Sequence, residues 1–182
     1  MPTFALGGSR NLSSHPAIAP VVQAALAAGH TLRVGCCTGA DALVIRSALA
    51  AHGAAALRVF AQFAPGGAGA CSVSAVGAVA AALAAGASVR FCAGGPVFAA
   101  GVQRSARLIR RSQAVIAGAQ ALVLFAPGAG ALSVAALAAA AGTQVFAFGS
   151  LAAPVCAGGA WAPSSLFGLP CWAWQPAQAS LF

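Results

Sequence analysis

Carboxylates are almost absent from this chain of 182 residues. The sequence has no glutamate and no lysine, and its single aspartate, Asp41, stands against nine arginines, so the formal net charge is +8. Glycosidases of the usual kind need a pair of carboxylates, and most general acid–base mechanisms use at least one. The composition therefore excludes paired-carboxylate catalysis and favours binding over catalysis.

A long unbroken apolar run is also missing. Residues 112–182 carry no charged side chain, but several glycines and Pro127 divide them into pieces shorter than the about 20 residues that a spanning helix needs. The first ten residues, MPTFALGGSR, lack the charged start and the apolar run of a signal peptide. We expect a soluble, cytoplasmic protein with no membrane partner.

The cysteines show no metal-binding or disulfide pattern. The six of them contain no C-x-x-C pair, and the histidines do not lie at ligand spacing from them. We therefore expect reduced, mostly buried cysteines and no metal. Cys36 and Cys37 precede a predicted helix start, which suits a thiol nucleophile, but no histidine is placed to serve it.

Apolar strands alternate with alanine-rich helices along residues 3–149. Strands are predicted at 3–8, 31–36, 56–63, 88–92, 121–127 and 143–149, and helices at 21–29, 40–53, 74–86, 101–118 and 131–142. Strands that are apolar throughout and joined by helices are typical of a mostly parallel sheet covered on both faces. The prediction is one α/β domain over residues 1–150.

Glycine-rich turns follow three of these strands. In such a fold ligands bind beyond the carboxyl ends of the strands, where glycines let the backbone approach and helix N–H groups face an anion. The alternative is plain turn geometry. The candidate phosphate-binding residues are Gly7, Gly8, Ser9, Arg10, Gly35, Thr38, Gly39, Asp41, Gly128, Gly130 and Ser133.

The predicted helix 101–118 carries the densest group of arginines. Arg104, Arg107 and Arg111 share one helix face by their spacing, and Arg110 adjoins them. The alternatives are a solvated helix face and a general bias toward arginine, but guanidinium groups suit phosphates and no acidic residue of the helix neutralises them. Arg107 and Arg111 are therefore added to the candidate site, whose anionic ligand is a nucleic acid or a nucleotide.

These motifs together resemble the Rossmann-like superfamily that unites DNA-processing protein A (DprA/Smf) with the LONELY GUY phosphoribohydrolases. The segments "GGSRNLSSHP", "GCCTGADALVIRSAL", "RRSQAVIAGAQALVLF" and "GALSVAALAAAAGTQVFAFG" resemble DprA segments in the same order. The resemblance covers about residues 3 to 149 and is missing over about 62 to 100. It implies a Rossmann-like fold in which Asp41 caps a helix and helps to form the ligand pocket.

The resemblance also bears on catalysis. The hydrolase signature P-G-G-x-G-T-x-x-E corresponds to "PGAGALSVA" here, with Ala135 in place of the glutamate. We therefore expect a non-catalytic DNA-processing protein that binds single-stranded DNA, with no certain cofactor beyond a bound nucleotide. The alternatives are a sensor of a free nucleotide and an altered phosphoribohydrolase-like enzyme. Asp41 is either a purely structural residue or one that orients Arg10 or a ribose hydroxyl.

The C-terminal residues divide into a Trp-rich extension (151–175) and a tail (176–182). The tail ends in QASLF, which resembles the pentapeptide motif of ligands of the bacterial sliding clamp. Leu181 and Phe182 would fill an apolar cleft and Gln178 would hydrogen-bond at its edge. The alternatives are docking on the protein's own domain and a chance match. The oligomeric state, including a homodimer, stays open.

Overall fold

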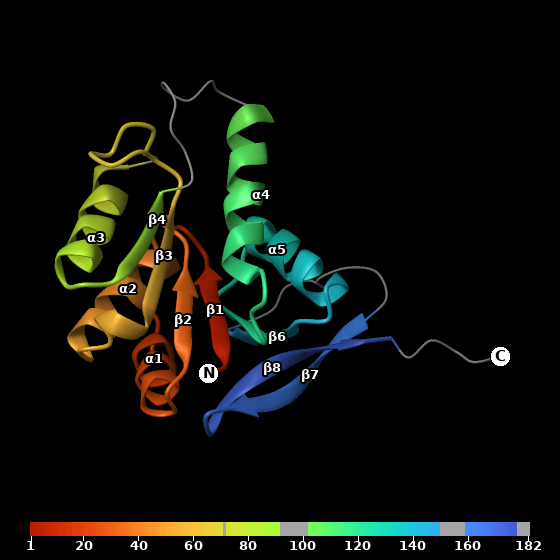
Figure 1. Cartoon of the computed structure of the whole chain (residues 1–182). Coiled ribbons are helices and arrows are strands. Elements are labelled where there is room, and N and C mark those ends of the chain that lie inside the picture. Colours follow the sequence, from red (N-terminus) through yellow and green to blue (C-terminus); the bar gives the residue numbers. More distant parts are fainter. Residues whose placement is uncertain (71, 92–101, 150–158, 178–182) are drawn as a thin grey trace.

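An eight-stranded sheet forms the centre of the molecule (Figure 1). The computed structural model describes residues 1–70, 72–91, 102–149 and 159–177, and of residues 102–107 the backbone alone. The strands are β1 (Thr3–Gly8), β2 (Thr31–Val34), β3 (Leu57–Ala61), β4 (Ser88–Phe91), β5 (Ala121–Phe125), β6 (Gln144–Phe148), β7 (Gly159–Leu166) and β8 (Leu169–Pro176). Their order is β4-β3-β2-β1-β5-β6-β8-β7. The first six in this order are parallel, and β8 is antiparallel to both its neighbours.

Helices cover both faces of the sheet (Figure 1). They are α1 (Ile18–Ala27), α2 (Ala40–Ala50), α3 (Val73–Ala84), α4 (Val102–Ile116) and α5 (Ala129–Ala140), with a short 3-10 helix at Ala54–Ala56. Apolar side chains of α1, α2 and α3 pack on one face, together with Leu32 and Val59. Those of α4 and α5 pack on the other, together with Ala5 and Leu122. The predicted α/β fold with a mostly parallel sheet is confirmed.

The central strand β5 shows why the strands are apolar throughout. All five of its residues are buried, because side chains that alternate between the two faces meet helices on both. β1 lies beside β5, although β2, β3 and β4 come between them in the sequence. From β1 the chain adds β2, β3 and β4 toward one edge of the sheet, and it then crosses back to place β5 on the other side of β1. The connections after β1 and β5 therefore run in opposite directions, which creates a crevice at the carboxyl ends of these two strands.

Helix α1 begins earlier than the sequence predicts. The structure starts it at Ile18 instead of residue 21, so that Pro20 lies in the first turn. Proline is tolerated there because the N–H groups of a first turn have no partner within the helix. Ile18 is thereby placed in the core beside Val21 and Val22.

The hairpin β7–β8 is not predicted by the sequence. A two-residue turn at Phe167 and Gly168, both with positive φ, joins its strands, as in tight antiparallel hairpins. The ring of Phe167 lies 5.6 Å from that of Phe4, and the rings of Trp161 and Trp174 meet edge to face at 5.5 Å. Part of the Trp-rich extension is therefore built into the sheet.

The described helices include none with both the length and the hydrophobicity that crossing a bilayer requires. The longest, α4, has 15 residues and carries arginines.

We predict that Trp174→Ala lowers the free energy of unfolding by about 3–5 kcal/mol, because the side chain is 8% exposed and fills the core beside α5. Trp172→Ala is the matched control, since Trp172 is 37% exposed on the same strand, and we expect a loss of less than about 1 kcal/mol. Chemical denaturation measures both. Equal losses would show that the hairpin does not pack as described.

Candidate functional site

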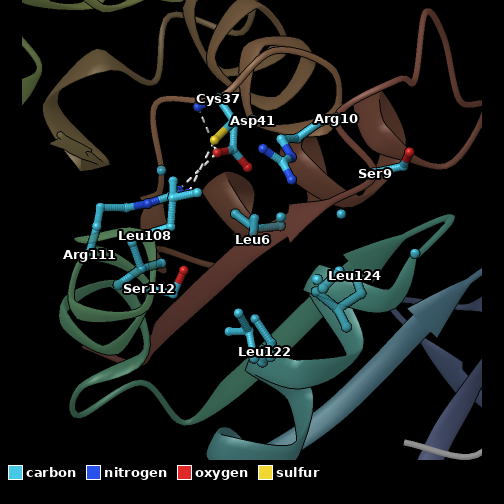
Figure 2. Close-up of a pocket in the computed structure, with 18 of the residues that line it drawn as sticks. Leu6, Ser9, Arg10, Cys37, Asp41, Leu108, Arg111, Ser112, Leu122 and Leu124 are labelled. Atoms are coloured by element: carbon cyan, nitrogen blue, oxygen red, sulfur yellow. Dashed lines mark hydrogen bonds and ion pairs between the residues drawn. The ribbon is translucent and has the colours of Figure 1, made fainter. Parts of the chain in front are cut away.

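A pocket of about 500 Å³ opens at the carboxyl ends of β1, β2 and β5 (Figure 2). Its walls come from the three glycine-rich turns and from α4 and α5. The lining residues are Leu6, Gly7, Gly8, Ser9, Arg10, Asn11, Gly35, Cys37, Thr38, Asp41, Leu108, Arg111, Ser112, Val115, Ile116, Leu122, Leu124, Gly128, Ala129, Gly130, Ala131 and Val134. The pocket lies where the strand order reverses, which is the usual ligand position in open α/β sheets.

Asp41 forms a buried ion pair with Arg111 at one side of the pocket. The Nη1 of Arg111 lies 3.0 Å from Oδ2 of Asp41, and the two side chains are 10% and 9% exposed. The same oxygen accepts a hydrogen bond of 2.9 Å from the backbone N–H of Cys37, and Nη2 of Arg111 donates to Sγ of Cys37 at 3.2 Å. The pair therefore ties the start of α2 to α4 across the crevice.

The environment of Arg111 keeps it charged. Burial opposes the charge, but the carboxylate of Asp41 and the thiols of Cys37 and Cys36 outweigh it and raise the pKa of Arg111 above its usual value. Its Nε is buried with no hydrogen-bond partner in the described part of the chain. The guanidinium of Arg111 therefore stays charged, and it holds the carboxylate of Asp41 in place in the pocket wall.

Gly35 makes this ion pair sterically feasible. A Cβ atom at this position would lie 1.4 Å from Nη1 of Arg111 and 2.5 Å from Oδ2 of Asp41. Any side chain here would displace the guanidinium group. Because Gly35 has no side chain, the guanidinium of Arg111 can lie directly against the backbone that follows β2.

The first two glycine-rich turns are locked together. The N–H of Ala40 donates to the carbonyl of Ser9 at 2.9 Å, and the hydroxyl of Thr38 donates to the carbonyl of Arg10 at 3.0 Å. Gly39 has a φ of 71°, and a Cβ there would lie 2.3 Å from the Ser9 carbonyl oxygen. The close contact between the turns therefore depends on glycine, and it fixes Arg10 at the pocket rim.

Arg10 is the second cation of the pocket. It is an exposed residue, and Figure 2 shows it and Arg111 on opposite sides of Asp41. The sequence left open whether Asp41 orients an arginine such as Arg10. In the structure Asp41 forms an ion pair with Arg111. Arg10 lines the pocket.

The structure brings most of the predicted site residues together. Gly7, Gly8, Ser9, Arg10, Gly35, Thr38, Asp41, Arg111, Gly128 and Gly130 line the pocket. Gly39 packs behind it, and Ser133 is exposed on α5, where its hydroxyl donates to the carbonyl of Ala129 at 3.0 Å. The side chain of Arg107 and the residues Gln178, Leu181 and Phe182 lie outside what the structure describes.

An apolar wall completes the pocket, and the sequence did not predict it. Leu122 and Leu124 of β5 lie at its floor (Figure 2), and Leu108 and Val115 of α4 also line it. The signal in the sequence is the spacing of two between the leucines, which places them on one face of the strand. The pocket therefore has an apolar floor in addition to the glycine-rich turns that the sequence predicts.

Groups for metal or acid–base chemistry do not gather in this pocket. In the described ranges no three His, Cys, Asp or Glu side chains could hold a metal ion together. Ala135, which the resemblance places at the catalytic glutamate, is fully buried against the sheet and does not line the pocket. Cys36, Cys37 and Cys171 are buried cysteines in the thiol form.

Comparison with known proteins supports the fold. Neither a family model nor a curated protein matches the chain. Among solved structures, DNA processing protein A (DprA) from Streptococcus pneumoniae is similar, with a TM-score of 0.55 and 19% identity over 84% of this chain and 52% of that one. The chain has a DprA-like, Rossmann-like fold. It spans about half the length of the DprA chain that it matches.

We predict that Asp41→Asn lowers the free energy of unfolding by about 3–5 kcal/mol, because it leaves the charge of Arg111 buried and unpaired. The double variant Asp41→Asn with Arg111→Met should recover much of this loss. Arg110→Met is the control, since Arg110 is the exposed neighbour on α4, and we expect almost no change. Chemical denaturation of the four proteins tests this. A loss that the double variant does not reduce would contradict a coupled pair.

Proposed function

We propose that this chain is a non-catalytic DNA-processing protein that binds single-stranded DNA and holds one nucleotide of the strand in the pocket. The observation that carries the proposal is the pocket itself, in which a cationic, glycine-lined rim faces an apolar wall. The similarity to a protein named for DNA processing agrees with it.

The polar half of the pocket suits a phosphate. Arg10 supplies a positive charge at the rim, and Arg111 adds a second, partly neutralised one. The first residues of α5, Ala129 and Gly130, also line the pocket, and N–H groups in the first turn of a helix have no partner within it. Such groups favour an anion, together with the positive end of the helix dipole.

The apolar half suits a nucleobase. In this mode a planar ring contacts the partly exposed Leu108 and the small exposed part of Leu122 and Leu124, while its sugar and phosphate reach the glycine turns. A volume of about 500 Å³ matches a ligand of this size. A free nucleotide, the second candidate ligand, also fits this volume.

Catalysis by Asp41 is disfavoured by its contacts. A general base must be able to accept a proton from the substrate. Oδ2 of Asp41 already binds both Arg111 and the N–H of Cys37, and the side chain is 9% exposed. These contacts support a positioning role for Asp41 within the pocket wall.

We predict that Gly130→Trp weakens binding of a short oligothymidylate at least about tenfold, because the new side chain would fill the pocket. A Cβ at Gly130 meets nothing within 4 Å, so the helix itself should be undisturbed. Gly77→Trp on α3 is the matched control, since its Cβ also meets nothing within 4 Å and it lies away from the pocket. Fluorescence anisotropy measures the affinities.

Competition by nucleoside monophosphates in the same assay separates the two candidates. Weak competition supports DNA, whereas complete displacement at low concentration would favour the free nucleotide. Equal binding by both glycine variants would show that the strand does not enter the pocket.

We also propose that the tail 176–182 recruits the protein to the bacterial sliding clamp. The support is the QASLF motif at the C-terminus, whose residues lie outside the described structure. A short motif of this kind binds through a few apolar anchors at its end.

A peptide of residues 173–182 should bind the clamp on its own, with a Kd on the order of micromolar, because a short peptide loses ordering entropy on binding. Leu181→Ala with Phe182→Ala should abolish this binding, and Pro176→Ala serves as the control outside the motif. Calorimetric titration measures the affinities. A wild-type peptide that gives no heat of binding, confirmed by no shift in anisotropy, would contradict clamp recruitment.

A further inference from the structure

Three arginines lie on three neighbouring strands at one edge of the sheet, two of them opposite each other and the third two residues further along its strand. In the pairing of β2 with β3, Arg33 is opposite Arg58, and in the pairing of β3 with β4, Phe60 is opposite Arg90. Register partners point to the same face, and so do residues two apart on one strand. Arg33, Arg58 and Arg90, here called the arginine row, therefore share one face with Phe60.

This face is the one on which α4 packs. Phe60 belongs to the same apolar cluster as Val115 of α4 and Leu122 of the pocket floor. Arg33 marks the inner end of the row, since its Nη1 donates to the carbonyl of Ala117, just beyond α4, and its guanidinium lies 5.7 Å from the centre of the Phe60 ring. The arginine row and the apolar wall of the pocket thus lie on the same side of the sheet, with α4 between them.

The outer part of the row is open to solvent. Arg58, Arg90 and Ser88, which is opposite Arg58, are exposed. β4 forms the edge of the sheet at this end (Figure 1). Adjacent strands are about 5 Å apart, and Arg90 is two residues beyond the register partner of Arg58, so these two arginines lie diagonally on neighbouring strands.

The arginines of the row carry positive charge in a chain with a single acidic side chain. Asp41 is the only carboxylate side chain of the chain, and it is bound by Arg111. Adjacent like charges raise the energy of the folded protein, and a polyanion laid across them relieves this repulsion and releases counterions.

We propose that the arginine row binds the phosphate backbone of a single-stranded nucleic acid whose other part occupies the pocket. This inference rests on the proposed function and extends it from one nucleotide to a polymer. The exposed Arg58 and Arg90 lie on neighbouring strands of an open surface, which fits a chain of phosphates better than a small anion that needs an enclosed site. Guanidinium groups bind these phosphates without regard to sequence.

The test compares two labelled oligothymidylates, of about 4 and about 20 nucleotides, in fluorescence anisotropy with the full chain. Arg58→Glu should weaken binding of the long strand about tenfold and flatten its salt dependence, and it should leave the short strand unchanged. Arg46→Glu is the matched control, because Arg46 is equally an exposed arginine but lies on α2, on the opposite face of the sheet. We expect it to change the affinity less than about threefold.

The outcomes are distinct from those for the pocket. An equal loss with Arg58→Glu and Arg46→Glu, or no loss with either, would overturn the arginine row. If Arg58→Glu lowered the affinity for the short strand as much as that for the long one, the proposal for the arginine row would also be overturned, because the substitution would then act through the pocket. A wild-type protein that binds the long strand but not the short one, with binding still sensitive to Arg58→Glu, supports the row and contradicts the pocket.

Discussion

The buried ion pair between Asp41 and Arg111 is the constraint on which the rest of the site depends. It joins the first turn of α2 to the middle of α4, and it requires a residue without a side chain at Gly35. Its carboxylate also holds the N–H of Cys37. A chain that has no other acidic side chain thus uses its single one for a contact that shapes the pocket. This explains the aspartate without assigning it any chemistry.

The parallel part of the fold follows from the sequence, whereas the hairpin does not. Strands such as β5, whose five residues are all buried, must be apolar throughout, and this pattern is visible in the sequence. The hairpin β7–β8 contains Pro163 and Pro170, and prolines argue against interior strands. Pro163 is accommodated because β7 is the edge strand, and Pro170 because the pairing of β8 with β6, within the described residues, is at Trp172 and Ala173. Such local pairing cannot be inferred from composition.

The sequence predicts the glycine-rich turns of the site but not its apolar floor. Glycines after strands indicate a close backbone approach, and the structure gathers most of those residues around one pocket. Two features were out of reach. In the sequence Leu122 and Leu124 look like ordinary core residues of a strand. The sequence does not show that the pocket lies between this part of the sheet and the helices that cover it. The partner of Asp41 is 70 residues away, and only the packing of α4 selects Arg111 over Arg10.

In the binding mode proposed above, the three glycine-rich turns bind one ligand together. Backbone amide chemical shifts of the ¹⁵N-labelled protein, recorded during titration with a short oligothymidylate, test this directly. The amides of Gly8, Gly35 and Gly130 should shift in parallel with one saturation curve, while Gly77 and Gly86 on the far helix α3 and its end stay unchanged. Shifts that are absent from these turns at saturation, or that follow separate curves, would contradict a common pocket.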